Sequence, residues 1–237
     1  MGTASRSFSL VDQKVAEAEF FLQRLAGCGP DFFAVRCYVG AFVSSSRSVT
    51  FSLQAVLSGT DGFREWYAKH QETLRANPTL RFFSDFRTVN IHIGENLAST
   101  GSFSCDSAVR YWFVPSPEVR EVPGEDVLEA CAHYFRAVLS IVFDCYMNFG
   151  PLIDAKQRFT EEYFSRLGKS IEDAEKELGL PRGYTDTGDP HSLPHRWQSL
   201  RDLQPGCEIN DLFDKYLGKV TTEPERLRPY APRGNTI

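Results

Sequence analysis

The chain has 237 residues, of which 42% are hydrophobic and 24% charged, and its formal net charge is −5. A chain of this length can bury a substantial core, and its apolar content excludes a mostly disordered protein. The acidic balance excludes broad, nonspecific attraction to nucleic acids or anionic membranes, so any RNA contact is expected at one local cleft. Nineteen Phe, nine Tyr and three Trp predict an aromatic-rich core, because aromatic side chains bury large areas.

The sequence also bears on the compartment. Its beginning lacks the apolar region of a signal peptide, and no segment reaches the roughly 18 uninterrupted apolar residues of a membrane helix. Six cysteines are scattered without a C-x-x-C pair, which indicates reduced, mostly buried thiols. We therefore expect a cytoplasmic protein without membrane contact.

The first hundred residues are predicted to form four helices. Apolar residues recur at helical spacing, and Gly-Pro, Gly-rich or Asn-Pro segments interrupt the pattern. The predicted helices span residues 9–26, 32–57, 63–76 and 79–93. Because the connections between them are short, neighbouring helices are expected to be antiparallel, as in an up-and-down bundle.

The pattern changes after residue 96. Apolar and polar residues alternate within residues 97–121, which predicts a small β-hairpin near residues 100–115. A fifth helix is expected to begin at Glu125 or Asp126 and to end near Asn148. Together these segments predict a mainly α domain over residues 1–150, namely a helical bundle with one small hairpin.

Residues 151–237 are predicted to form a less core-like helical extension. A helix over residues 159–178 carries a run of acidic and basic residues, including Glu175, and we expect this face to be solvated. Residues 181–194 are rich in Gly, Pro, Thr and Asp, which is typical of a loop or flexible arm. A short helix over residues 210–217 is expected to precede a loosely ordered tail.

The strongest local signal is the segment Arg87-Thr88-Val89-Asn90-Ile91-His92, an R-x4-H motif at the end of the fourth predicted helix. In this motif and its bundle context the sequence resembles the HEPN superfamily (higher eukaryotes and prokaryotes nucleotide-binding). Many members are four- or five-helix bundles that bear R-x4–6-H and act as metal-independent RNases. The resemblance covers roughly residues 9–149. It implies a homodimeric endoribonuclease, a toxin or defence effector, in which Arg87 and His92 are catalytic.

A longer ordered set of segments strengthens the resemblance in fold. The chain is similar to uncharacterised bacterial HEPN-like proteins in the helix segment 41–51, which reads AFVSSSRSVTF. It is also similar to them in Gly62-Phe63…Trp66-Tyr67 and in Phe82-Phe83…Arg87…His92, which follow in the same order.

The chemistry of metal-free RNA cleavage suits these residue types. A histidine can deprotonate the 2′-hydroxyl, and an arginine can stabilise the charge that develops on the phosphate. Residues five apart on a helix point about 140° from each other, so a two-fold dimer is expected to bring two copies of Arg87 and His92 into one cleft. Arg47, Thr88 and Asn90 are the candidate substrate-binding residues. Thr88 departs from the Asn, Asp or His that commonly follows the arginine in active members.

Structural roles for the same residues remain open. Arg87 could pair with Asp85 or Glu95, and His92 could interact with the negative end of its helix. Arg47 could pair with a buried carboxylate or with backbone carbonyl groups.

The alternative function is a non-catalytic HEPN-like binding or protein-interaction module. Thr88 and the acidic total favour it, as does the net charge of zero over residues 61–96, which contain five basic and five acidic side chains. Its surface would be formed by the hairpin and the C-terminal arm.

Cofactor motifs are weak by comparison. His191 and His195 are four residues apart, but Pro194 and the preceding Gly- and Pro-rich segment do not favour a helical metal site. No P-loop or dinucleotide-binding glycine motif is present, and we expect no metal and no cofactor.

Overall fold

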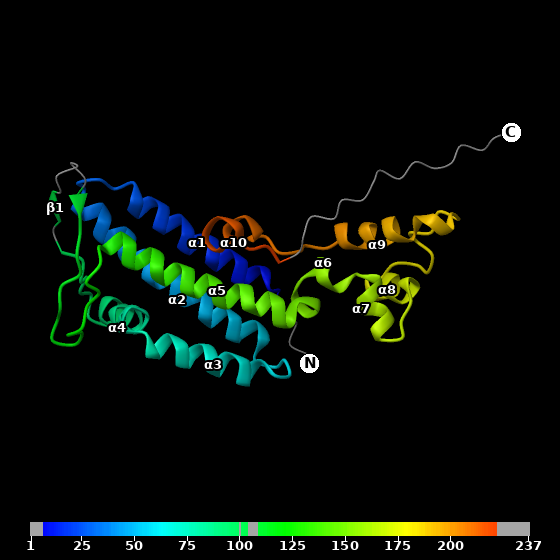
Figure 1. The fold of residues 1–237 in the computed structure, drawn as a ribbon, viewed down its shortest axis with the longest axis horizontal. Helices are drawn as coiled ribbons and strands as arrows, with labels where there is room; N and C mark the ends of the chain where they lie inside the picture. The colour runs from blue at the N-terminus through cyan, green and yellow to red at the C-terminus, as the bar shows by residue number, and fades with distance from the viewer. Residues whose placement is uncertain (1–6, 100, 104–108, 222–237) are drawn as a thin grey trace. The chain divides into compact units, whose positions relative to one another are not determined.

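The protein was analysed as a computed structural model that describes residues 7–99, 101–103 and 109–221. The chain divides into two compact units, residues 1–142 and 143–237. The long helix α5, Val127–Ile153, contributes to both units. The fold is mainly helical with very little strand (Figure 1), which confirms the predicted mainly α class. No helix within the described ranges is long and apolar enough to span a membrane.

Four helices and the first part of α5 form the first unit. The four are α1 Ser9–Ala26, α2 Phe32–Leu57, α3 Phe63–Ala76 and α4 Pro78–His92, and their bounds agree closely with the predicted ones. Two N-caps explain this agreement. The Asp31 carboxylate accepts a hydrogen bond from the Ala34 amide at 3.0 Å, and the Asn77 side chain accepts one from the Leu80 amide at 3.2 Å. Such caps satisfy amides that have no partner within the helix.

Aromatic rings form much of the core of this unit. Phe83 of α4 stacks on Tyr134 of α5 with 4.5 Å between ring centroids, and it meets Phe42 of α2 edge-on at 6.3 Å. Phe86, one turn later on α4, packs against Phe113 at 5.6 Å. All five rings are buried, which confirms for these residues that the aromatic composition builds a core.

The predicted hairpin is present as a short antiparallel pair, β1 Ser102–Phe103 and β2 Val109–Arg110. A bridge between Ala98 and Phe113 extends the pairing towards the core. Gly101 is required at this position, because a Cβ atom there would lie 2.1 Å from the Arg110 carbonyl oxygen. The hairpin thus places Phe113 beside the aromatic rings of α4.

The second unit is more ordered than the sequence indicated. It contains the end of α5 and the short helices α6 Ala155–Arg158, α7 Glu161–Arg166, α8 Ile171–Glu177, η1 Pro190–Ser192, α9 Leu193–Asp202 and α10 Asn210–Leu217. The single helix expected over residues 159–178 is wrong: Gly168 has a φ of 66° between α7 and α8, and Thr160 and Ser170 begin new helices. The tail expected after residue 221 lies outside the described residues.

This unit is less core-like than the first, as expected, but it has a hydrophobic core of its own, which the sequence did not predict. Phe159, Phe164, Ile171, Trp197 and Leu200 are buried together, with the Phe164 and Trp197 ring centroids 5.3 Å apart. The core was missed because its residues come from four short helices, none of which is long enough to show a clear apolar period.

Glu175 is the clearest correction, because its side chain is fully buried rather than solvated. Its carboxylate accepts hydrogen bonds from the Gly183 amide at 2.5 Å, from the Thr185 amide at 2.8 Å and from the Thr185 hydroxyl at 2.7 Å. Arg196 of α9 lies 3.4 Å from the same carboxylate. Burial raises the pKa of Glu175, but these hydrogen bonds outweigh it and hold the pKa below its usual value. Residues 183–185 are therefore tied to α8. Of the loop or flexible arm expected over residues 181–194, residues 181–189 form a loop, and η1 and α9 begin within the rest.

Candidate functional site

Two arginines from different helices meet at one aromatic ring in the first unit. Arg47 and Phe51 lie one turn apart on α2, and the Arg47 guanidinium carbon is 4.7 Å from the Phe51 ring centroid. Arg87 of α4 approaches the same ring, with its guanidinium carbon 5.9 Å from the centroid. Phe51 is 46% exposed, and both arginines are partly exposed. We call these three residues the Arg47–Phe51–Arg87 cluster.

A close approach between α2 and α4 positions this cluster. A Cβ atom at Gly40 would lie 3.3 Å from the Asn90 side-chain oxygen, so the absence of a side chain lets Asn90 pack against α2. The Asn90 side-chain nitrogen donates to the Glu95 carbonyl at 3.3 Å. Nearby, the Asn96 side-chain nitrogen donates to the Arg36 carbonyl at 2.7 Å. Asn90 thus lies in the contact between the helices, where it orients α4.

The hydrogen bonding of the two arginines is incomplete. Arg47 donates from Nη1 to the Thr50 hydroxyl at 3.2 Å. Arg87 makes no hydrogen bond or ion pair with any residue in the described ranges, and its Nε is buried without a partner. The pairing of Arg87 with Asp85 or Glu95 that the sequence left open does not occur there. A buried donor without an acceptor is costly and uncommon.

The electrostatic environment leaves this positive charge largely uncompensated. Helix α2 contains no acidic residue, and neither Arg47 nor Arg87 forms an ion pair in the part of the chain that the structure describes. Behind the cluster, burial raises the pKa of Tyr134 to about 12, Arg47 lowers it and Tyr67 raises it. The charge of Arg47 is thus felt inside the bundle.

The remaining candidate residues lie apart from the cluster. The Thr88 hydroxyl donates to the Ser84 carbonyl at 3.2 Å within α4. His92 is the exposed last residue of α4, and it makes no hydrogen bond, ion pair or ring contact with the described residues. Its neighbours Ile91 and Ile93 are 46% and 58% exposed. The structure therefore brings together Arg47 and Arg87, and it does not bring His92 or Thr88 to them.

Phe51 is the part of the cluster that the sequence reasoning missed. Its spacing of four residues from Arg47 is a usable signal, because residues i and i+4 lie on the same face of a helix. The participation of Arg87 had no local signal, since it depends on how α4 packs against α2.

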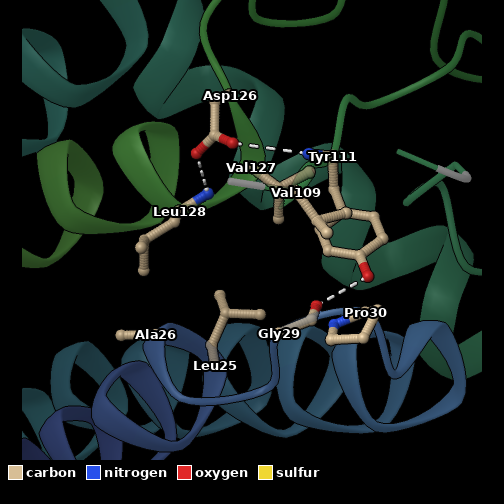
Figure 2. A pocket seen from close by; sticks show the side chains of 9 residues that line it. All are labelled: Leu25, Ala26, Gly29, Pro30, Val109, Tyr111, Asp126, Val127 and Leu128. Atoms are coloured by element: carbon tan, nitrogen blue, oxygen red, sulfur yellow. Dashed lines mark hydrogen bonds between the residues drawn. The ribbon is translucent and has the colours of Figure 1, made fainter. Parts of the chain in front are cut away.

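A separate pocket of about 310 Å³ lies between the end of α1 and the start of α5 (Figure 2). The polar groups of Asp126 and Tyr111 that line it already form hydrogen bonds within the protein. The Asp126 carboxylate accepts hydrogen bonds from the Leu128 amide at 2.8 Å and from the Tyr111 amide at 3.4 Å. The Tyr111 hydroxyl donates to the Gly29 carbonyl at 2.8 Å (Figure 2). These bonds cap α5 and join the hairpin to the α1–α2 connection, so the pocket is explained by structure alone.

Within the described ranges, no group of three or more His, Cys, Asp or Glu side chains is arranged to hold a metal ion. His191 lies in η1 and His195 in α9.

Comparisons with known proteins assign no relatives. No protein-family description, no curated protein and no solved structure matches this chain significantly. Membership in the HEPN superfamily, and the roles of Arg87, His92, Arg47, Thr88 and Asn90, therefore stay predictions.

Proposed function

We propose that the chain is a binding module that holds a phosphate group of RNA or of a nucleotide at the Arg47–Phe51–Arg87 cluster. One observation carries this proposal: the guanidinium groups of Arg47 and Arg87 approach the same Phe51 ring, and neither forms an ion pair with any described residue. Guanidinium groups bind phosphate through parallel N–H···O bonds that match its geometry. A phosphate oxygen would accept hydrogen bonds from the Nη donors of Arg87, which make no hydrogen bond with the described residues.

The second arginine supports the same ligand. Arg47 uses one of its five donors for Thr50, which leaves others for a shared anion. Both guanidinium carbons lie close to one ring centroid, so their separation cannot exceed the sum of the two distances. An anion bound by both guanidinium groups would balance both positive charges.

The test is binding of a labelled single-stranded RNA by wild-type protein and by matched arginine variants. Arg87→Met and Arg47→Met should each weaken binding at least tenfold. Arg75→Met, which removes an exposed arginine at the end of α3, should change it less than twofold. With one phosphate held, log Kd should depend only weakly on log salt, with a slope of about 0.7. An equal loss in all three variants would show nonspecific attraction and refute the proposal.

A second candidate, the homodimeric metal-independent endoribonuclease, is favoured by the surroundings of His92. The exposed histidine stands between two exposed isoleucines, and a second copy of the chain covering that apolar pair would place His92 in a shared cleft. Wild-type protein should then sediment as a dimer and cleave RNA in the presence of EDTA, and His92→Ala should abolish cleavage without preventing dimer formation. Intact RNA after incubation with wild-type dimer would reject this candidate.

A further inference from the structure

We infer that the ligand of the Arg47–Phe51–Arg87 cluster is a terminal phosphate monoester, such as the phosphorylated end of an RNA or a nucleoside monophosphate, rather than a phosphodiester inside a strand. This inference rests on the proposed function and narrows it. It follows from the charge of the cluster, the number of its donors and the surface beside it.

The charge of the cluster matches a dianion. Arg47 and Arg87 supply two positive charges, and no acidic side chain in the described ranges pairs with either. A phosphodiester carries one negative charge, whereas a monoester carries about −1.5 to −2 at pH 7. Because both arginines are partly buried, an uncompensated charge costs more there than on an open surface. A monoester neutralises both guanidinium groups, and a diester leaves one unbalanced.

The number of donors points the same way. Each guanidinium has five N–H donors, and in the described residues only one of the ten is used, in the Arg47 bond to Thr50. A terminal phosphate offers three oxygen acceptors, so two arginine forks can each engage a pair of oxygens and share one. An internal diester has two non-bridging oxygens and cannot satisfy both forks in this way.

The two helices that carry the cluster hold few other cations. The next arginine on α4, Arg81, is paired with Glu121 at 2.7 Å, and residues 61–96 have no net charge. The other arginine of α2, Arg36, lies eleven residues before Arg47, which is about three helical turns away. On α2 and α4, a strand that passed through the cluster would therefore find no further unpaired arginine or lysine within two turns. A strand that ends there would need only the two arginines and the half-exposed Phe51 ring, which gives its last nucleotide an apolar contact.

The experiment compares RNA octamers of one sequence that differ only at their ends. The probes carry a 5′-phosphate, a 3′-phosphate or hydroxyls at both ends, and adenosine monophosphate and inorganic phosphate serve as competitors. A phosphorylated end should bind at least tenfold more tightly than the hydroxyl form, and adenosine monophosphate should compete with it. Arg87→Met and Arg47→Met should remove this preference, while Arg75→Met should keep it. Circular dichroism of each variant would show that its helices are intact.

The outcomes distinguish a failure of this inference from a failure of the proposed phosphate-binding function. If all octamers bind equally and binding still depends on Arg87, the phosphate site stands and the preference for a terminal monoester is refuted. If no octamer and no competitor binds, both are refuted. A preference for the phosphorylated end that persists in Arg87→Met would place the monoester elsewhere on the chain and would also overturn the inference.

Discussion

Replacing Arg87 by methionine should stabilise the folded chain while removing its ligand. Methionine keeps the unbranched aliphatic stem that packs against α2, and it removes the guanidinium. A residue kept for folding would give the opposite result, because its loss would destabilise the protein. The substitution therefore separates a binding role for Arg87 from a structural one.

The size of the effect can be worked from the contacts. A buried donor left without an acceptor costs about 1–3 kcal/mol, and Nε of Arg87 is in that state. Against this, the guanidinium lies 5.9 Å from the Phe51 centroid, near the outer limit of a cation–π contact worth about 0.5–1 kcal/mol at exposed sites. Loss of repulsion between Arg87 and Arg47 adds a small further gain. The net change should be a stabilisation of about 0.5–2 kcal/mol.

Urea unfolding followed by circular dichroism, without added phosphate, measures this change. The urea midpoint of Arg87→Met should rise with the slope unchanged, which is the signature of a stability change alone. Adding adenosine monophosphate should raise the midpoint of the wild-type protein by mass action and leave that of the variant unchanged. A fall of the variant's midpoint that corresponds to a loss of more than about 1 kcal/mol in the free energy of unfolding would show that Arg87 stabilises the fold and would refute the reasoning.

Three further predictions concern the stability contributions of Glu175, Tyr134 and Gly101. Glu175→Gln should destabilise residues 155–202 by about 3 kcal/mol, because it leaves two amides and Arg196 without their carboxylate. The control Glu172→Gln, at a more exposed carboxylate, should cost under about 1 kcal/mol. Hydrogen exchange in residues 171–202 measures both changes. Because the folded pKa of Glu175 is lowered, the carboxylate contributes fully to the free energy of unfolding above the unfolded pKa near ~4.3. This contribution should disappear as pH falls through the folded pKa, and Glu175→Gln should lack that pH dependence. The pKa of Tyr134 is raised to about 12, so the neutral phenol contributes fully to the free energy of unfolding below pH ~10, and this contribution is lost as pH rises towards 12. Tyr134→Phe should therefore flatten the fall in unfolding free energy over that pH range. Equal slopes against pH in the wild-type protein and the variant would count against this prediction. Gly101→Ala should lower the urea midpoint by about 1–3 kcal/mol equivalent, because its Cβ would overlap the Arg110 carbonyl; an unchanged midpoint would contradict this.

The sequence predicts the helices of the first unit well because their ends are encoded locally. Asp31 and Asn77 lie where N-caps are needed, and Pro78 follows in the first turn of α4. Glu175 shows where local reading fails. In the sequence it belongs to a run of charges, and its burial depends on residues 183–185 folding back over α8. No local pattern contains that information.

The candidate site was only partly predictable for the same reason. The motif drew attention to Arg87, and the polar centre of α2 drew attention to Arg47. Their meeting at Phe51 depends on the close packing of Asn90 against Gly40, which is a tertiary contact. The motif also paired Arg87 with His92, whereas the structure directs Arg87 towards α2 and leaves His92 exposed at the end of its helix.

The most direct test of the phosphate site is the ¹H–¹⁵N resonance of Arg87 Nε, assigned by its loss in Arg87→Met. Titration with adenosine monophosphate should move this resonance, because an anion bound at the neighbouring Nη donors changes the charge distribution of the guanidinium. The Arg75 Nε resonance serves as the control and should not move. An Arg87 Nε resonance that stays unchanged at saturating nucleotide would contradict the assignment of the phosphate to this cluster.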